Sequence, residues 1–118
     1  MAKLNINQIA LNEREWSKGL MHTNPLADDQ CALFVFDSPR DYSFWNFDVS
    51  YPIDVAFFDD SATLIHVGKL DAHQTTPVKS GNKIKYVVET SVDWFNKNNI
   101  TLGSNLWNLV NLKLKASS

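Results

Sequence analysis

The apolar residues of this chain fall in short segments separated by polar residues, a pattern typical of β-strands. Leu4 and Ile6 alternate with polar residues and predict a half-buried opening strand. Residues 31–36 form a continuous apolar run, which has the length of a fully buried strand. Residues 42–48 alternate again and predict a further strand.

The second half of the chain continues this pattern. Residues 53–58 and 63–67 flank the short polar segment 59–61, a spacing and composition that predict a β-hairpin. Residues 84–89 predict another strand, and residues 106–115 predict the last one, because they end in a strict alternation of Leu and Lys. The strands therefore number about seven, and a mainly β fold is expected.

Two short helices are expected between the strands. An Asn-x-x-Glu spacing that begins at Asn12 predicts a capped helix start, and this helix should end before Pro25. Thr90 or Ser91 is a suitable cap for a second helix, which should end in the Asn-rich cluster around Asn98.

Length and composition indicate a single folded domain over residues 1–118. The chain has 118 residues, of which 44% are hydrophobic and 20% are charged, as is ordinary for a globular protein. The net charge of −2 provides no basic surface for a phosphate backbone, so nucleic-acid binding is not expected.

The compartment is predicted from two features of the sequence. No apolar stretch reaches the roughly 18 residues of a membrane-spanning helix, and residues 1–8 lack the apolar core of a signal peptide. The single cysteine, Cys31, cannot form an internal disulfide, which is typical of a reducing compartment. We therefore expect a cytoplasmic protein without membrane contact.

A series of short motifs, spread over most of the chain, resembles a known family. In chain order the motifs are Gly19-Leu20-Met21, Leu33-Phe34-Val35-Phe36, Phe44-Trp45, Pro52-Ile53-Asp54-Val55-Ala56-Phe57, Lys85-Tyr86-Val87-Val88-Glu89, Trp94 and Gly103. Their order and spacing are similar to those of the domain of unknown function 192 family, also called uncharacterised protein family 0127, from about Leu4 to Leu114. The resemblance implies a small β-barrel or jelly-roll-like sandwich with one or two short helices, and no established reaction.

The chain departs from the family pattern at three places. Cys31-Ala32 stands where the family typically has Gly-Met, and Asp93 stands where it usually has Gly. Residues 46–49 replace the family's Met-Lys-Asn-Thr, so most of a shared polar stretch is lost. If that stretch serves a ligand in relatives, this chain is expected to bind a different ligand or none.

Two carboxylates in apolar strands are the first candidates for chemistry. Asp54 lies between Ile53 and Val55, and Glu89 ends the apolar run that starts at residue 84, so burial is expected to raise the pKa of both. Facing each other across a groove, they could act as a general acid and base, with Arg14 as an anion clamp. The structural alternative is that they accept hydrogen bonds from the backbone or pair with Arg14.

Metal and thiol chemistry find less support in the sequence. His22, His66, His73, Asp71 and Cys31 are potential ligands, but none has the spacing of a metal motif. We therefore predict no metal and no cofactor. Cys31, inside an apolar run, is interpreted as a small buried residue rather than a nucleophile.

Aromatic residues cluster in one segment of the chain. Trp45, with Tyr42, Phe44, Phe47 and Tyr51 nearby, could form a binding face for sugar rings or for an apolar patch of a partner. The alternative is that these side chains fill the core, because a domain of this size needs large side chains in its interior.

Two hypotheses about function follow from these residues. The preferred one is a non-enzymatic domain, a monomer or a homodimer, that binds a small ligand, carbohydrate included, or a protein. Its candidate binding residues are Trp45, Asp48, Tyr51, Asp54, Lys69 and His73, the last two from the irregular segment 69–83. The alternative is a small hydrolase or lyase that uses Asp54 and Glu89.

Overall fold

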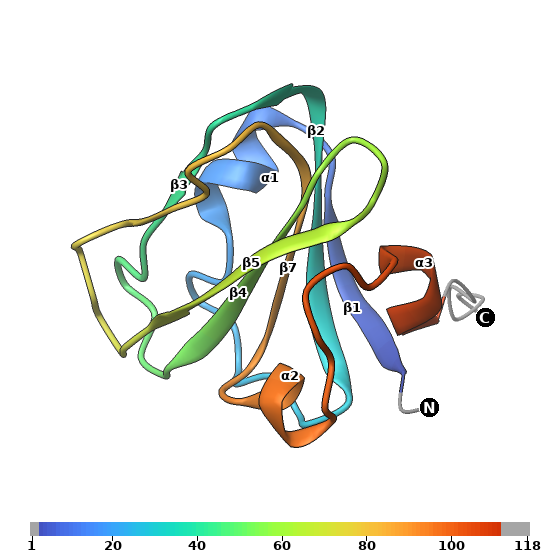
Figure 1. Ribbon diagram of the computed structural model, residues 1–118. Helices are drawn as coiled ribbons and strands as arrows, with labels where there is room; N and C mark the ends of the chain where they lie inside the picture. Colours follow the sequence, from blue (N-terminus) through green and yellow to red (C-terminus); the bar gives the residue numbers. More distant parts are fainter. Residues whose placement is uncertain (1–2, 112–118) are drawn as a thin grey trace, which may run out of the picture.

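The computed structural model describes residues 3–111 and shows a mainly β protein (Figure 1). Within this part of the chain there are eight strands and three short helices. They are β1 (Leu4–Ala10), α1 (Glu13–Lys18), β2 (Gln30–Arg40), β3 (Ser43–Phe44), β4 (Ile53–Phe58), β5 (Leu64–Leu70), β6 (Val78–Lys79), β7 (Ile84–Ser91), α2 (Trp94–Lys97), α3 (Leu106–Leu109) and β8 (Val110–Asn111).

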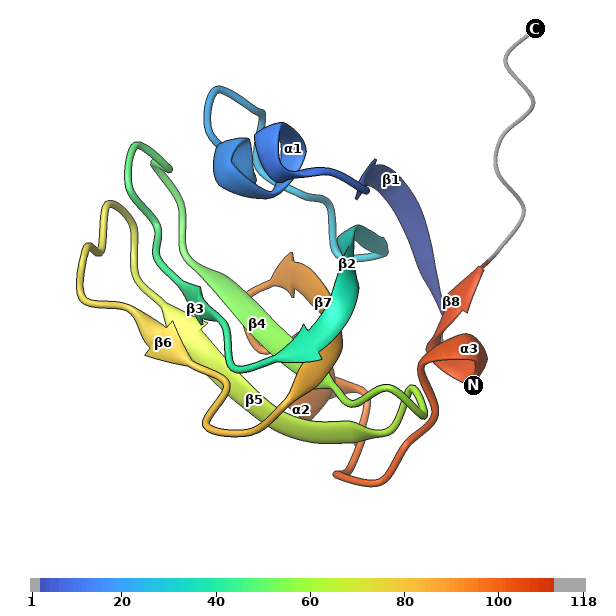
Figure 2. The same ribbon diagram turned by 90° about the horizontal axis from the view of Figure 1, so that it is seen from above.

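Six of the strands form one sheet, in the order β5-β4-β7-β2-β1-β8. The strands from β5 to β2 pair antiparallel, whereas β1 runs parallel to both of its neighbours, β2 and β8. The sheet curls into a half-barrel, which is seen end-on in Figure 2, and β3 and β6 pair as a separate two-stranded sheet. The predicted mainly β fold is thus confirmed.

Each face of the curled sheet has its own hydrophobic core. On the first face Phe34, Val55 and Val87 pack with α1, the turn that follows it and the small β3–β6 sheet. On the second face residues such as Leu33 and Val88 pack with α2, α3 and the segment between them. Because successive side chains of a strand point to opposite faces, the position of a residue in its strand decides which core it joins.

The predicted helix starts agree with the structure in part. Asn12 caps α1, since its Oδ1 accepts a hydrogen bond of 3.0 Å from the backbone N–H of Glu15. The second predicted helix is present as α2, but it begins later than expected because β7 continues to Ser91. No helix within residues 3–111 is long and apolar enough to cross a membrane.

The strand predicted over residues 106–115 is wrong at its start. Leu106 and Leu109 lie in α3, where their spacing of three residues brings both onto the second core. Asn105 Oδ1 caps this helix by accepting a 2.9 Å bond from the N–H of Trp107. Strand pairing then begins at Val110, and residues 112–115 lie outside the described part of the chain.

Two further segments differ from their predicted form. Of the strand predicted over residues 42–48 only β3 is extended and paired, because the chain turns after it and Asp48 adopts a positive φ of 58°. Lys69 and Leu70, which were expected to open a long irregular segment, belong to β5, and β6 interrupts the rest of that segment.

Gly68 allows the small β3–β6 sheet to pack closely against β5. A Cβ atom at Gly68 would lie 2.5 Å from Cγ1 of Val78 in β6, which is too close for any side chain. We expect Gly68→Ala to lower the free energy of unfolding by about 1–3 kcal/mol, as overpacking does in cores. Urea denaturation of Gly68→Ala with and without Val78→Ala tests this, and an equal loss in both backgrounds would contradict the steric explanation.

Candidate functional site

The first face of the sheet carries a pocket of about 240 Å³. It lies between the end of α1, the β3 strand with the loop after it, and the sheet. Its lining consists of residues 16–21 and 42–47 together with Phe36, Val49 and Glu89. The pocket is therefore built by segments that are distant in the sequence and that the fold brings together.

Aromatic side chains form much of the inner wall. The indole Nε1 of Trp16 donates to the carbonyl oxygens of Ala10 and Val35 at 3.1 and 3.0 Å, which fixes the ring between β1 and β2. Trp16 also packs on Phe36, and the ring of Phe36 stacks on Tyr42 with 3.8 Å between the centroids. These rings are held by hydrogen bonds and by each other, so the wall exists before any ligand arrives.

Two further aromatic residues stand at the rim. Trp45 and Phe47 stack with their ring centroids 5.3 Å apart, yet they are 53% and 50% exposed. Exposed stacked rings that border a pocket are unusual in a folded domain, whose large apolar side chains are mostly buried. The arrangement offers a ligand two aromatic surfaces at the mouth of the site.

The loop after β3 is held in place by Asn46. The Asn46 side chain is buried, and its Nδ2 donates to the carbonyl oxygens of Tyr51 and Asp71 at 2.9 and 3.0 Å. The backbone N–H of His73 adds a 2.8 Å bond to the carbonyl oxygen of Val49. The loop after β3, residues 45–49, is called the rim loop, and it is therefore anchored to the neighbouring turn around residues 71–74.

Glu89 is the one carboxyl group in the wall of the pocket. Its residue is 3% exposed, and its cross-strand neighbours are the apolar residues Ala32 on β2 and Val55 on β4. No residue between positions 3 and 111 forms a hydrogen bond or ion pair with the Glu89 carboxyl group. Burial raises the pKa of Glu89 from 4.5 to about 8, so the group is largely protonated at neutral pH.

Tyr51 and Asp48, which were predicted as binding residues, are not part of the pocket lining. Tyr51 is buried, and its hydroxyl group shares a 2.6 Å hydrogen bond with Thr23 Oγ1, which joins the loop after α1 to the loop before β4. Burial raises the pKa of Tyr51, and the charge of Glu89 raises it further. Asp48 Oδ2 lies 3.6 Å from Nε2 of His22, so the same two loops also meet at the surface.

Asp54 does not lie in the pocket. In the β4–β7 register Asp54 is opposite Thr90 and Val55 is opposite Glu89, so the two carboxylates point to opposite faces of the sheet. The predicted pairing of Asp54 with Glu89 across a groove is therefore wrong. An acid/base mechanism that uses both groups on one substrate has no geometric support.

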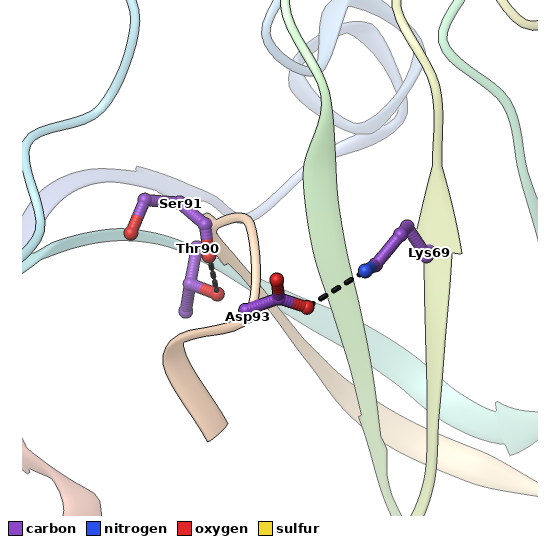
Figure 3. Close-up of polar contacts among 4 residues, drawn as sticks. All are labelled: Lys69, Thr90, Ser91 and Asp93. Carbon is purple, nitrogen blue, oxygen red and sulfur yellow. Dashed lines mark hydrogen bonds and ion pairs between the residues drawn. The ribbon is translucent and has the colours of Figure 1, made fainter. Parts of the chain in front are cut away.

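Asp54 instead belongs to a polar cluster at the end of the second face, part of which is drawn in Figure 3. Lys69 lies opposite Asp54 on β5, and its Nζ is 2.7 Å from Oδ1 of Asp93. Burial raises the pKa of Asp54, whereas a hydrogen bond from the Asp93 backbone and the charge of Lys69 lower it. This cluster holds the turn into α2, so Lys69 and Asp54 are interpreted as structural residues.

The remaining candidates are also placed by the structure. Arg14 is exposed on α1, outside the pocket lining, and within residues 3–111 it forms no ion pair with Asp54 or Glu89. The predicted anion clamp is therefore not formed. His73 is exposed and adopts a positive φ of 59°, and its backbone rather than its imidazole supports the rim loop.

Metal and thiol chemistry gain no support from the geometry. Among the described residues, no group of three or more His, Cys, Asp or Glu side chains is arranged to hold a metal ion. Cys31 is fully buried on the second face, and burial raises the pKa of its thiol to about 12. The thiol is therefore neutral and out of contact with solvent.

The similarity to known proteins agrees with the fold. Residues 3–107 match the DUF192 family, whose members are described as uncharacterised. The chain belongs to the DUF192 family. No curated protein is significantly similar to it in sequence.

Two solved structures share the fold of this DUF192 protein. One is a proposed transcription regulator from Sinorhizobium meliloti 1021, with 21% identity, a TM-score of 0.79, and 82% of this chain and 76% of that chain covered. The other is a protein of unknown function from Novosphingobium aromaticivorans DSM 12444, with 20% identity, a TM-score of 0.80, and 85% of this chain and 73% of that chain covered. At these identities the likeness shows the fold alone.

The positions expected to depart from the family pattern can be placed in the structure. Asp93 adopts a left-handed φ of 66°, which Asp tolerates better than most residues. The segment 46–49 supplies Asn46, Phe47 and Val49 to the pocket wall of this DUF192 member.

Several lining residues of the DUF192 pocket were not predicted as site residues. These residues are Trp16, Phe36 and residues 18–21. No local signal identifies them, because they reach the pocket through the crossover from β1 to β2. Trp45 and Glu89, which were predicted, lie together in the wall.

Proposed function

We propose that this protein is a small-ligand-binding domain and that the pocket around Glu89 is its binding site. The observation that carries the proposal is a buried carboxyl group without a protein partner in the wall of a pocket lined by aromatic residues. Buried polar groups almost always have hydrogen-bond partners, so a buried group that lacks one needs an explanation, such as a functional role or a bound molecule. The ligand would supply the missing partner of the Glu89 carboxyl group.

The size of the pocket supports a small ligand. Its volume of about 240 Å³ is near the lower end of small-molecule sites, so it fits one compact group rather than an extended chain.

Binding is favoured over catalysis by the composition of the wall. Apart from Glu89, the titratable side chains of the lining are Lys18 and Tyr42, and Asp54 lies on the other face. A hydrolase or lyase needs a second group to act with the first, as a nucleophile, a base or an acid. We also propose a cytoplasmic setting, which suits the buried free thiol of Cys31.

The proposal is tested by a fragment screen monitored by NMR on the full chain. The protein has four Trp residues, of which Trp16 and Trp45 line the pocket and Trp94 and Trp107 do not. A bound fragment should shift the indole signals of Trp16 and Trp45 and leave those of Trp94 and Trp107 in place. Failure of a diverse library to shift the first pair would contradict the proposed function.

A matched pair of variants refines this test. Trp45→Ala removes an exposed ring from the rim, and we expect it to weaken fragment binding about tenfold or more, because aromatic contacts dominate small sites. Trp107→Ala removes a ring that is 39% exposed and outside the pocket, and it should leave the affinity unchanged. Equal losses in both variants would point to a general effect on folding.

A further inference from the structure

We propose that the ligand of this pocket is a small organic cation, a protonated amine or quaternary ammonium group on a compact apolar frame, bound with its positive charge between the aromatic walls and the Glu89 carboxylate. The inference rests on the proposed function and specifies its ligand class. It combines two features of the site. One is the aromatic surface of the lining, and the other is the Glu89 carboxyl group, which has no partner of positive charge among residues 3–111.

The lining surface is suited to a cation. Six aromatic side chains, Trp16, Phe36, Tyr42, Phe44, Trp45 and Phe47, border the cavity. The faces of aromatic rings carry partial negative charge and attract cations, and pockets of several rings are the usual means by which proteins hold quaternary ammonium groups. The rings at the inner wall are fixed by hydrogen bonds and stacking, so a cation would find them already oriented.

The carboxyl group supplies the counter-charge. Glu89 is more than nine-tenths buried, lacks a partner within residues 3–111 and lines the cavity. Among those residues Asp54 Oδ1 is the one fully occluded side-chain polar atom without a partner, so the unpartnered Glu89 oxygens keep some exposure. Because Glu89 lines the pocket, a ligand there is adjacent to its carboxyl group. A cation placed there would turn a costly buried acid into a buried ion pair.

A neutral sugar fits these observations less well. Sugar hydroxyl groups need several donors and acceptors, and buried hydroxyl groups without partners weaken binding. The amide group of Asn46 already donates to two backbone carbonyl oxygens, and the Tyr42 hydroxyl group already bonds Arg40 and Ser38. The other polar side chains of the wall are Ser17, Lys18, Ser43 and Glu89. The carbohydrate ligand considered from the sequence is therefore the weaker alternative.

Other charged groups near the site do not remove the preference of the pocket for a cation. Lys18 is exposed at the mouth of the pocket, where solvent and salt screen its charge. His22 and Asp48 meet at the surface with their side chains 73% and 52% exposed. Burial raises the pKa of Tyr51, so its phenol group is neutral at physiological pH. The sheet residues that flank Glu89 are Ala32 and Val55.

The ligand class implies that binding is linked to proton release. Because burial raises the pKa of Glu89 to about 8, the empty site holds a proton at neutral pH. A permanent cation favours the carboxylate, so one proton leaves the Glu89 carboxyl group for solvent as each cation binds. Affinity should therefore rise about tenfold per pH unit below the pKa of the empty site and level off above it.

Choline and its neutral isostere 3,3-dimethylbutan-1-ol are suitable probes. They have nearly the same shape and differ in charge, because a carbon in the alcohol replaces the charged nitrogen of choline. Binding is measured by calorimetry and by the Trp45 indole shift at pH values from 6 to 9. We expect choline to bind at least tenfold more tightly than the alcohol at pH 9 and the difference to shrink toward pH 6. Glu89→Gln should remove both the preference for choline and the pH dependence.

Two further variants test whether the pH dependence of binding comes from Glu89 or from the charged residues near it. Lys18→Ala should retain the pH dependence and bind choline as well as or better than the parent, since it removes a positive charge from the mouth. His22→Ala should also retain the pH dependence, because the His22 imidazole is exposed at the surface. Loss of the pH dependence in His22→Ala would overturn the assignment of the proton to Glu89.

The outcomes for the ligand class and for the site are distinguishable. Equal affinity for choline and the alcohol, or neutral fragments that bind where choline does not, would overturn the cation and leave the binding site in place. If no compound of either kind shifts the Trp16 and Trp45 signals, the proposed function itself fails.

Discussion

Glu89→Gln is expected to raise the free energy of unfolding at pH 9 by roughly 3–5 kcal/mol, while changing it little at pH 4. The substitution keeps the shape of the side chain and removes its ability to ionise. Because Glu89 is buried without a protein partner among the described residues, its charged form is unfavourable in the folded state. An amide at this position is always neutral, as the protonated carboxyl group is at low pH.

The sign of the effect follows from the direction of the pKa shift. Burial raises the pKa of Glu89 from 4.5 to about 8, so the folded protein holds a proton that the unfolded chain releases. The contribution of this group to stability is fully present below pH 4.5 and is lost as the pH rises through about 8. Each unit of pKa difference corresponds to about 1.4 kcal/mol, which sets the scale of the change.

Urea denaturation of parent and variant between pH 4 and pH 9 measures this difference. The subtraction cancels groups that titrate in both proteins, including Asp54, whose pKa is also raised by burial. Asp48→Asn is the matched control, because it makes a carboxyl-to-amide change at a side chain that is 52% exposed. Parallel profiles for the parent and Glu89→Gln would show that Glu89 is not buried in this way.

Phe34→Ala is expected to destabilise the protein by about 3–5 kcal/mol, whereas Phe47→Ala should change its stability by less than about 0.5 kcal/mol. Phe34 is fully buried in the centre of β2 and packs edge-on against Phe44, which lines the pocket. Its ring also lies beneath Gly19, at the turn that follows α1. Removal of the ring would leave a cavity under both walls of the site.

The two Phe variants remove the same atoms, so their comparison isolates burial. Phe47 is half exposed and contacts Trp45, and its loss should affect binding rather than folding. Thermal and urea unfolding provide the stabilities, and the Trp16 and Trp45 indole shifts report on the pocket. Similar stabilities for the two variants would mean that Phe34 does not occupy the core described above.

The strands could be predicted from the sequence where the apolar run is continuous and has the length of a strand. Residues 31–36 and 53–58 are continuous apolar runs, and both are buried strands in the structure. Residues 106–109 were assigned to a strand because a short apolar segment fits a helix and a strand equally well. The Asn105 cap and the packing of Leu106 against the second core decide in favour of the helix.

The site could be predicted only in its composition. Glu89 and Trp45 were identified because a carboxylate in an apolar strand and a cluster of aromatic residues are visible in the sequence. The sequence does not show which face each side chain occupies, since this depends on the register between β4 and β7. Asp54 and Glu89 were grouped because each lies in an apolar strand, and a shift of one residue in the register would have brought both to one face.

The pairing of β1 with β8 has a consequence for the synthesis of the chain. Leu4 leaves the ribosome well before one of its strand partners, Val110, which lies more than a hundred positions later in the chain. During translation β1 therefore has an unsatisfied hydrogen-bonding edge for most of the time that the domain takes to emerge. Closure of this edge depends on long-range contacts, so folding is expected to finish late and to be slow compared with that of helical proteins of similar length.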